Sequence, residues 1–101
     1  MAKQVWKYFI HVYSAMSVTV KMPADAKIVH VEYEGPSTEK LSFWAEVDST
    51  KSDVERNFEM FATGQHIPVK AQYVGTAVIS PNKNFTPVVY HLYETFPPVK
   101  E

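Results

Sequence analysis

Cysteine is absent from the 101 residues, which excludes disulfide bonds and thiolate metal sites. Arginine occurs only once, at Arg56, and the 10 basic residues nearly balance the 11 acidic ones. The net charge of −1 therefore provides no basic field for duplex nucleic acid. The four histidines do not stand at spacings typical of metal ligands, so the sequence predicts neither a metal ion nor another cofactor.

Long apolar runs are also missing. No segment approaches the roughly 18 consecutive apolar residues that cross a membrane. Residues 1–12 alternate polar with apolar positions instead of forming a signal peptide. We therefore expect no membrane partner and a location in the cytoplasm. Apolar residues still make up 46% of the chain, which is enough for the core of one folded domain.

Alternation of polar and apolar residues with a period of two runs through most of the sequence. β-Branched and aromatic residues are frequent in these segments, and turn residues separate them. Six segments show the pattern clearly: 5–12, 18–22, 27–34, 41–47, 70–80 and 88–94. With a seventh candidate at 52–62, they predict an all-β, single-domain antiparallel sandwich or barrel of about seven strands over residues 1–95. Residues 96–101 are expected to form a C-terminal tail.

Three places within these segments carry more specific expectations. Ile28 and Val29 point to opposite faces of their strand, with Val29 on the side of Val31. Gly75 stands in the middle of an apolar segment and indicates a bulge or the close approach of another backbone. The last segment is apolar on both faces, which predicts a central strand rather than an edge strand.

The segment 52–62 is compatible with two structures. Ser52 and Glu55 form a capping box, and the apolar residues after them stand at helical spacing, which would give an α+β domain with one helix. Arg56 and Phe58, however, belong to an alternating series that is typical of a strand. The residues alone favour neither structure.

Several short motifs follow one another in a distinctive order. They are VWKYFI at 5–10, MPADAKIVHV at 22–31, FWAEVD at 43–48, ERNFEMFATGQHI at 55–67, YVGT at 73–76 and VVYHLYE at 88–94. This order resembles a family of short tailed-phage and bacterial proteins with the motifs V-W-K-Y, M-P-x-x-A-x-I, W-A-x-V-D, R-x-F-x-x-x-x-T-G and Y-V-G-T. The resemblance implies phage ancestry and favours a strand at 52–62. Asp25 and Ala62 replace glycines of the family, so Ala62 would be strained if its position required a positive φ.

The loop that follows residue 61 is one candidate ligand site. Its backbone N–H groups, hydroxyl, amide and imidazole are groups that bind an anion or a nucleotide phosphate. The alternative is a tight turn that only ends a strand. The candidate ligand-binding residues here are Phe61, Thr63, Gly64, Gln65 and His66.

Two further candidates lie outside this loop. Trp44 stands on the polar face of its strand, where it could stack on a base or anchor a partner, or pack in a second layer. Arg56 could bind a phosphate or carboxylate through two hydrogen bonds. Its alternative is a structural ion pair with Glu55, Glu59 or Asp48.

Three functions fit these observations. The first is a non-catalytic, phage-type binding protein in the host cytoplasm, acting as a homo-oligomer, that sequesters a host signalling nucleotide or blocks a host protein. The second is a virion accessory or structural interaction module. The third is a small hydrolase that uses His66 or the pair Glu32 and Glu34. No nucleophile elbow, Walker loop or dinucleotide fingerprint occurs, so we predict that the protein is not an enzyme.

Overall fold

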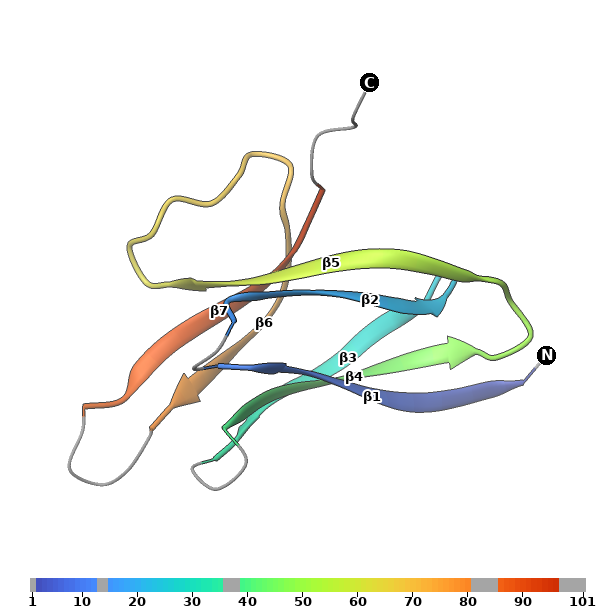
Figure 1. Cartoon of the computed structure of the whole chain (residues 1–101), viewed down its shortest axis with the longest axis horizontal. Coiled ribbons are helices and arrows are strands. Elements are labelled where there is room, and N and C mark those ends of the chain that lie inside the picture. The colour runs from blue at the N-terminus through green and yellow to red at the C-terminus, as the bar shows by residue number, and fades with distance from the viewer. Residues whose placement is uncertain (1, 13–14, 36–38, 81–85, 97–101) are drawn as a thin grey trace.

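Two antiparallel β-sheets form the described part of the fold (Figure 1). The computed structural model describes residues 2–12, 15–35, 39–80 and 86–96. The strands within them are β1 (Lys3–His11), β2 (Ser17–Pro23), β3 (Lys27–Glu34), β4 (Lys40–Asp48), β5 (Asp53–Ala62), β6 (Gln72–Ile79) and β7 (Val88–Thr95). Sheet A has the strand order β1-β4-β3, and sheet B has the order β2-β5-β7-β6. The predicted all-β class is confirmed. The predicted tail, apart from Phe96, lies outside the described residues.

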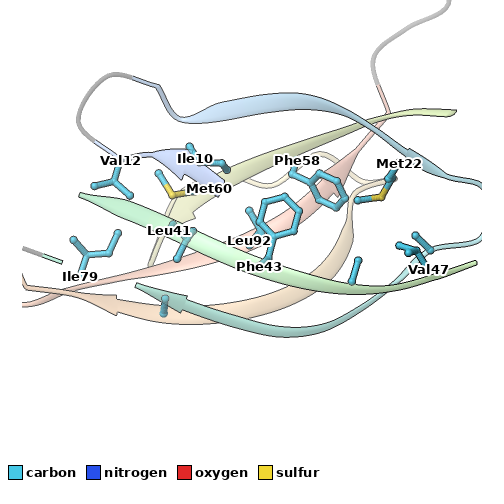
Figure 2. Close-up of a cluster of buried hydrophobic side chains, with 13 residues drawn as sticks. Ile10, Val12, Met22, Leu41, Phe43, Val47, Phe58, Met60, Ile79 and Leu92 are labelled. Atoms are coloured by element: carbon cyan, nitrogen blue, oxygen red, sulfur yellow. The ribbon is translucent and has the colours of Figure 1, made fainter. Parts of the chain in front are cut away.

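The two sheets pack face to face as a sandwich, with no strand pair joining them among the described residues. The rings of Phe43 in β4 and Phe58 in β5 meet between the sheets, with centroids 4.9 Å apart. Both side chains are fully buried, and burial of one such ring contributes about 1.5–3 kcal/mol. The rest of this core consists of Ile10, Val12, Met22, Ala26, Leu41, Ala45, Val47, Met60, Ala77, Ile79 and Leu92 (Figure 2).

The ambiguous segment 52–62 forms strand β5, and the alternative helix is not present. β5 pairs with β2 on one side and with β7 on the other. Phe58 and Met60 stand two residues apart and are both buried between the sheets. A helix would turn these two side chains to different faces and would leave β2 and β7 without the strand that joins them.

Strand β3 contains a bulge that changes which side chains reach the core. Its pairing with β4 shifts register between Ile28 and His30, so Val29 is an extra residue. Ile28 and Val31 pack against the core, whereas Val29 is 49% exposed. The prediction that Val29 shares a face with Val31 is wrong, because strict alternation does not anticipate an inserted residue.

Strand β6 contains a second bulge, which faces the first. Its pairing with β7 shifts register between Tyr73 and Gly75. A Cβ atom at Gly75 would lie only 2.5 Å from Cγ2 of Val31, so β3 and β6 approach each other closely there. The bulge expected at Gly75 is thus confirmed, and the group that approaches the glycine closely is the Val31 side chain rather than a backbone. The two bulged edge strands close one side of the sandwich.

Residues 63–71, which connect β5 to β6, cross over sheet B. Both strands pair antiparallel with β7, which lies between them, so β5 and β6 run parallel to each other. Because sheet A fills the inner face, the connection passes over the outer face of β7. Pro68 and Val69 border a hollow of about 430 Å³ there, opposite Thr95. The prediction that the last strand is central is confirmed.

We expect Tyr8→Phe to stabilise the protein. The Tyr8 ring stacks on Phe43 at 5.7 Å, and its hydroxyl oxygen is buried with no hydrogen-bond partner among the described residues. Burial of the phenol raises its pKa; the negative charge of Asp53 adds to the effect, and the positive charge of Arg56 opposes it. Removing an unsatisfied buried hydroxyl should raise the free energy of unfolding by about 1 kcal/mol, measured by urea denaturation.

Tyr73→Phe is the matched control for this prediction. The Tyr73 hydroxyl is hydrogen-bonded to Oγ1 of Thr76 at 2.7 Å, and the residue is 60% exposed. Its removal should leave the stability unchanged or slightly lower. The prediction fails if Tyr8→Phe loses as much stability as Tyr73→Phe or more. That result would show that the Tyr8 hydroxyl has a hydrogen-bond partner in solution.

Candidate functional site

The predicted ligand-binding residues lie in three separate places of one molecule. Trp44 stands on the outer face of sheet A, where it pairs with Lys7 of β1 and His30 of β3. Arg56 lies between the two sheets, and the candidates from Phe61 onward lie at the end of β5 and in the turn after it. One copy of the chain therefore does not bring these candidates together into a single pocket.

The turn after β5 is closed by its own hydrogen bonds. The backbone N–H of Gln65 donates to the Ala62 carbonyl at 3.0 Å, and the backbone N–H of Ala62 donates to Oε1 of Gln65, also at 3.0 Å. Gly64 has a φ of 92°, whereas Ala62 keeps a negative φ and is not strained. At the other replaced glycine, Asp25 adopts a φ of 64°, and its carboxylate accepts a hydrogen bond from Lys51 at 2.8 Å.

A chain of hydroxyl groups links this turn to the middle of sheet B. Thr63 Oγ1 lies 3.0 Å from Nε2 of His91, and Thr76 Oγ1 lies 3.0 Å from Nδ1 of the same ring. Tyr73 extends the chain through its contact with Thr76. Sequence reasoning treated the turn as a separate candidate site and missed this link, because His91 is 28 residues away from Thr63.

The two remaining turn candidates differ in accessibility. Phe61 is only 3% exposed and packs edge-on against Tyr93, with ring centroids 5.7 Å apart. His66 is exposed on the connection that crosses sheet B. Of these two side chains, His66 is the one that a ligand in solution can reach without a rearrangement.

Arg56 of β5 forms an ion pair with Glu94 of the neighbouring strand β7, within sheet B. Its Nε and Nη2 atoms donate to the two carboxylate oxygens of Glu94 at 2.9 and 2.8 Å, and Nη1 donates to the Ala26 carbonyl. The side chains of Arg56 and Glu94 are 18% and 12% exposed. The prediction that Arg56 pairs with Glu55, Glu59 or Asp48 is wrong. Its partner Glu94 lies on β7, which the pairing of β5 with β7 brings next to Arg56.

The outer face of sheet A combines aromatic, apolar and charged side chains, all of them exposed or half-buried except the buried Ser42. We name it the aromatic face. Its aromatic and apolar members are Val5, Phe9, His11, His30 and Trp44, and its charged and hydroxyl members are Lys7, Glu32, Glu34, Lys40 and Ser42.

Two lysines lie over aromatic rings on the aromatic face. Nζ of Lys7 is 5.3 Å from the Trp44 ring centroid, and Nζ of Lys40 is 4.2 Å from that of Phe9. His30 packs on the other side of Trp44, with centroids 5.3 Å apart. These cation–π and ring contacts hold the side chains in place before any partner arrives.

Glu34 ties the charged part of this face together. Its Oε1 atom lies 2.6 Å from Nζ of Lys7 and accepts a hydrogen bond from Oγ of the buried Ser42, also at 2.6 Å. The hydrogen bond from Lys7, and then that from Ser42, lower the pKa of the Glu34 carboxyl. The resulting stabilisation is fully present above the ordinary glutamate pKa of about 4.3 and is lost as the pH falls through the lower pKa of the folded state.

We expect Lys7→Met to raise the pKa of Glu34 towards its ordinary value, because the variant removes the main cause of the shift. A pH titration of the Glu34 carboxyl carbon by NMR measures the change directly. Lys3→Met is the control, since Lys3 pairs with Glu46 instead, at 3.3 Å. An unchanged Glu34 pKa in Lys7→Met would show that this ion pair does not persist in solution.

The described residues contain no group of three histidine, aspartate or glutamate side chains placed to hold a metal ion. Nor do the described ranges include a helix that is long and apolar enough to span a membrane.

The geometry thus defines a small all-β sandwich that presents an open aromatic face and open strand edges. The chain belongs to a family described as a domain of unknown function (DUF7352), whose model matches residues 1–101. Neither the curated proteins nor the solved structures contain a significant match to this sequence.

Proposed function

We propose that this protein is a non-catalytic binding protein of phage type that covers and blocks a host protein with its aromatic face. The observation that carries the proposal is the placement of Trp44 at the centre of sheet A, between Lys7 and His30. Tryptophan next to a cation is a common anchor of protein interfaces. The proposal places the protein in the host cytoplasm, in a counter-defence role.

Two properties of the aromatic face support a protein partner. Phe9 and Val5 are 39% and 57% exposed, so the partner would bury apolar area that is now in water. The face is carried by three paired strands, and its side chains already contact one another. Such a surface loses little conformational freedom on binding.

Sequestration of a signalling nucleotide has weaker support. A nucleotide needs a pocket in which stacking and phosphate-binding groups converge. Trp44 and Arg56 lie on different sides of sheet A, and the guanidinium of Arg56 is engaged by Glu94 and Ala26. A nucleotide site made from these residues would therefore require a second copy of the chain or a change in the Arg56 contacts.

The test begins with affinity capture from a host lysate by the wild type, Trp44→Ala and Phe9→Ser. Tyr73→Ser is the matched control, because it removes an exposed ring from the outer face of sheet B. We expect one protein to be captured by the wild type and the control but not by the two aromatic-face variants. The captured protein is then purified, and its affinity is measured by calorimetry. Each aromatic-face variant should weaken binding by about tenfold or more.

Native mass spectrometry of the freshly purified protein separates the alternatives. A bound mass that matches a nucleotide and survives in Phe9→Ser would overturn the proposal in favour of nucleotide sequestration. Capture of a virion protein instead of a host protein would assign the same face to a virion interaction module. Equal affinity for the wild type and both aromatic-face variants would remove the aromatic face from the mechanism.

A further inference from the structure

The two open sides of the sandwich are built differently. On one side the edge strands β3 and β6 both carry bulges and pack closely at Val31 and Gly75. On the other side β1 and β2 are the edge strands, and they border a hollow of about 380 Å³ between the sheets. We call this second side the β1–β2 seam (Figure 1).

The hollow at the β1–β2 seam exposes part of the core. Its apolar lining includes Tyr8 and Ile10 of β1 and Val18 and Val20 of β2. Ile10 is buried, but the other three side chains are only half-buried, although they pack against the core cluster. The β1 part of the lining, residues 7–11, is continuous and about 17 Å long at 3.3 Å per residue. A short extended chain has these dimensions.

The backbone of β1 is regular enough to pair with such a chain. Its nine residues pair with β4 without any register shift, from Lys3 opposite Asp48 to His11 opposite Lys40. On its other side β1 has no strand partner within the described ranges, so its outward N–H and C=O groups are available, apart from the His11 carbonyl, which accepts a hydrogen bond from the Ala15 N–H at 3.0 Å. Bulges, which prevent pairing at the edges of β3 and β6, do not interrupt this ladder.

The charge of the seam selects the partner. Strands β1 and β2 carry Lys3, Lys7, His11 and Lys21 but no aspartate or glutamate, in a chain whose net charge is −1. The ion pairs of Lys3 and Lys7 with sheet A carboxylates reduce this charge, whereas Lys21 has no such pair among the described residues. Pairing of β1 with β1 of a second copy would bring lysine next to lysine, which is unfavourable. An acidic chain meets no such repulsion.

We propose that the β1–β2 seam binds an extended, acidic segment of a partner protein, which adds to sheet A as a strand beside β1. Alternate apolar side chains of the segment fill the hollow against Val18 and Val20, and its carboxylates lie on the outer side near Lys7 and His11. The site shares the side chains of Lys7, Phe9 and His11 with the edge of the aromatic face, but its strand ladder and its hollow lie outside that face. Its test therefore does not depend on the function proposed above.

The probes are three nine-residue peptides. In the first, glutamate alternates with valine; in the second, lysine replaces glutamate; the third is the glutamate peptide with every backbone amide N-methylated. We expect the glutamate peptide to bind at least about tenfold more tightly than the lysine peptide at low salt. N-methylation should abolish binding, because it removes the donors of a strand ladder. NMR shift changes and slowed amide exchange should lie in β1, with shift changes at Val18 and Val20.

Three variants locate the site. Val18→Asp places a charge in the hollow and should weaken binding of the glutamate peptide by about tenfold or more. His11→Glu changes an exposed side chain and should reverse the preference towards the lysine peptide. Val78→Asp, on the bulged strand β6 and 56% exposed, is the control and should bind like the wild type. Because His11→Glu alters no buried group, it decides the question even if Val18→Asp does not fold.

Four results would overturn the inference. They are equal binding of the glutamate and lysine peptides, binding that survives N-methylation, shift changes outside β1 and β2, and no detectable binding at millimolar peptide. Dimerisation of the protein through β1, with the seam closed to all three peptides, would likewise overturn it and assign the seam to a second copy. Loss of host-protein capture in Trp44→Ala would leave the inference unaffected.

Discussion

Arg56→Met should lower the free energy of unfolding by about 3–5 kcal/mol, which is much of the total stability of a domain of this size. The variant leaves the Glu94 carboxylate largely buried without the guanidinium that now binds both of its oxygens. It also leaves the Ala26 carbonyl without its donor from Arg56. Urea denaturation followed by circular dichroism measures the loss.

The double variant Arg56→Met/Glu94→Met tests the reason for this loss. Replacing both members of a buried ion pair with apolar residues is often neutral or stabilising, so the double variant should recover most of the stability. Lys51→Met, which removes the exposed ion pair with Asp25, should change the stability far less. A double variant as unstable as Arg56→Met would show that the loss comes from packing rather than from an unpaired charge.

Gly75→Ala should lower the free energy of unfolding by about 1–3 kcal/mol, because the new methyl group would overlap with the Val31 side chain. Val31→Ala makes room for that methyl group. The double variant Gly75→Ala/Val31→Ala should therefore be more stable than the sum of the two single losses predicts. The wild type, the two single variants and the double variant form a double-mutant cycle, and urea denaturation of all four proteins measures the coupling between the two positions.

Gly64→Ala serves as the control for this cycle. Nothing lies within 4 Å of a Cβ atom at Gly64, so its cost comes from the backbone, whose φ is 92°. In the double variant Gly64→Ala/Val31→Ala, the loss of unfolding free energy should equal the sum of the losses in the two single variants. Strict additivity for Gly75→Ala as well would mean that β3 and β6 separate easily and do not close that side of the sandwich.

The fold was predictable as far as local alternation reaches. Strands, turns and the central position of β7 follow from side-chain periodicity and composition, which act within a few residues. The bulge at Val29 was not predictable, because it follows from the contact between β3 and β6, more than 40 residues apart in the chain. For β5, the residues alone left helix and strand equal, and its two strand neighbours decide the matter.

The site was predictable only as a set of residue types. Trp44 was placed on the polar face of its strand, but its neighbours Lys7 and His30 come from strands that only the sheet order places beside it. Arg56 was recognised as notable, yet its partner Glu94 is 38 residues away. Sequence spacing gives no information on such pairs, because sheet pairing and not chain distance determines them.

The position of β7 has a consequence for biosynthesis. β7 is the last strand among the described residues and the middle strand between β5 and β6, so sheet B cannot be completed until the ribosome has released residues 88–95. Sheet A, in contrast, is complete once β4 has been made. Until residues 88–95 have emerged, the nascent chain should therefore hold a finished sheet A whose apolar face is not yet covered by a complete sheet B.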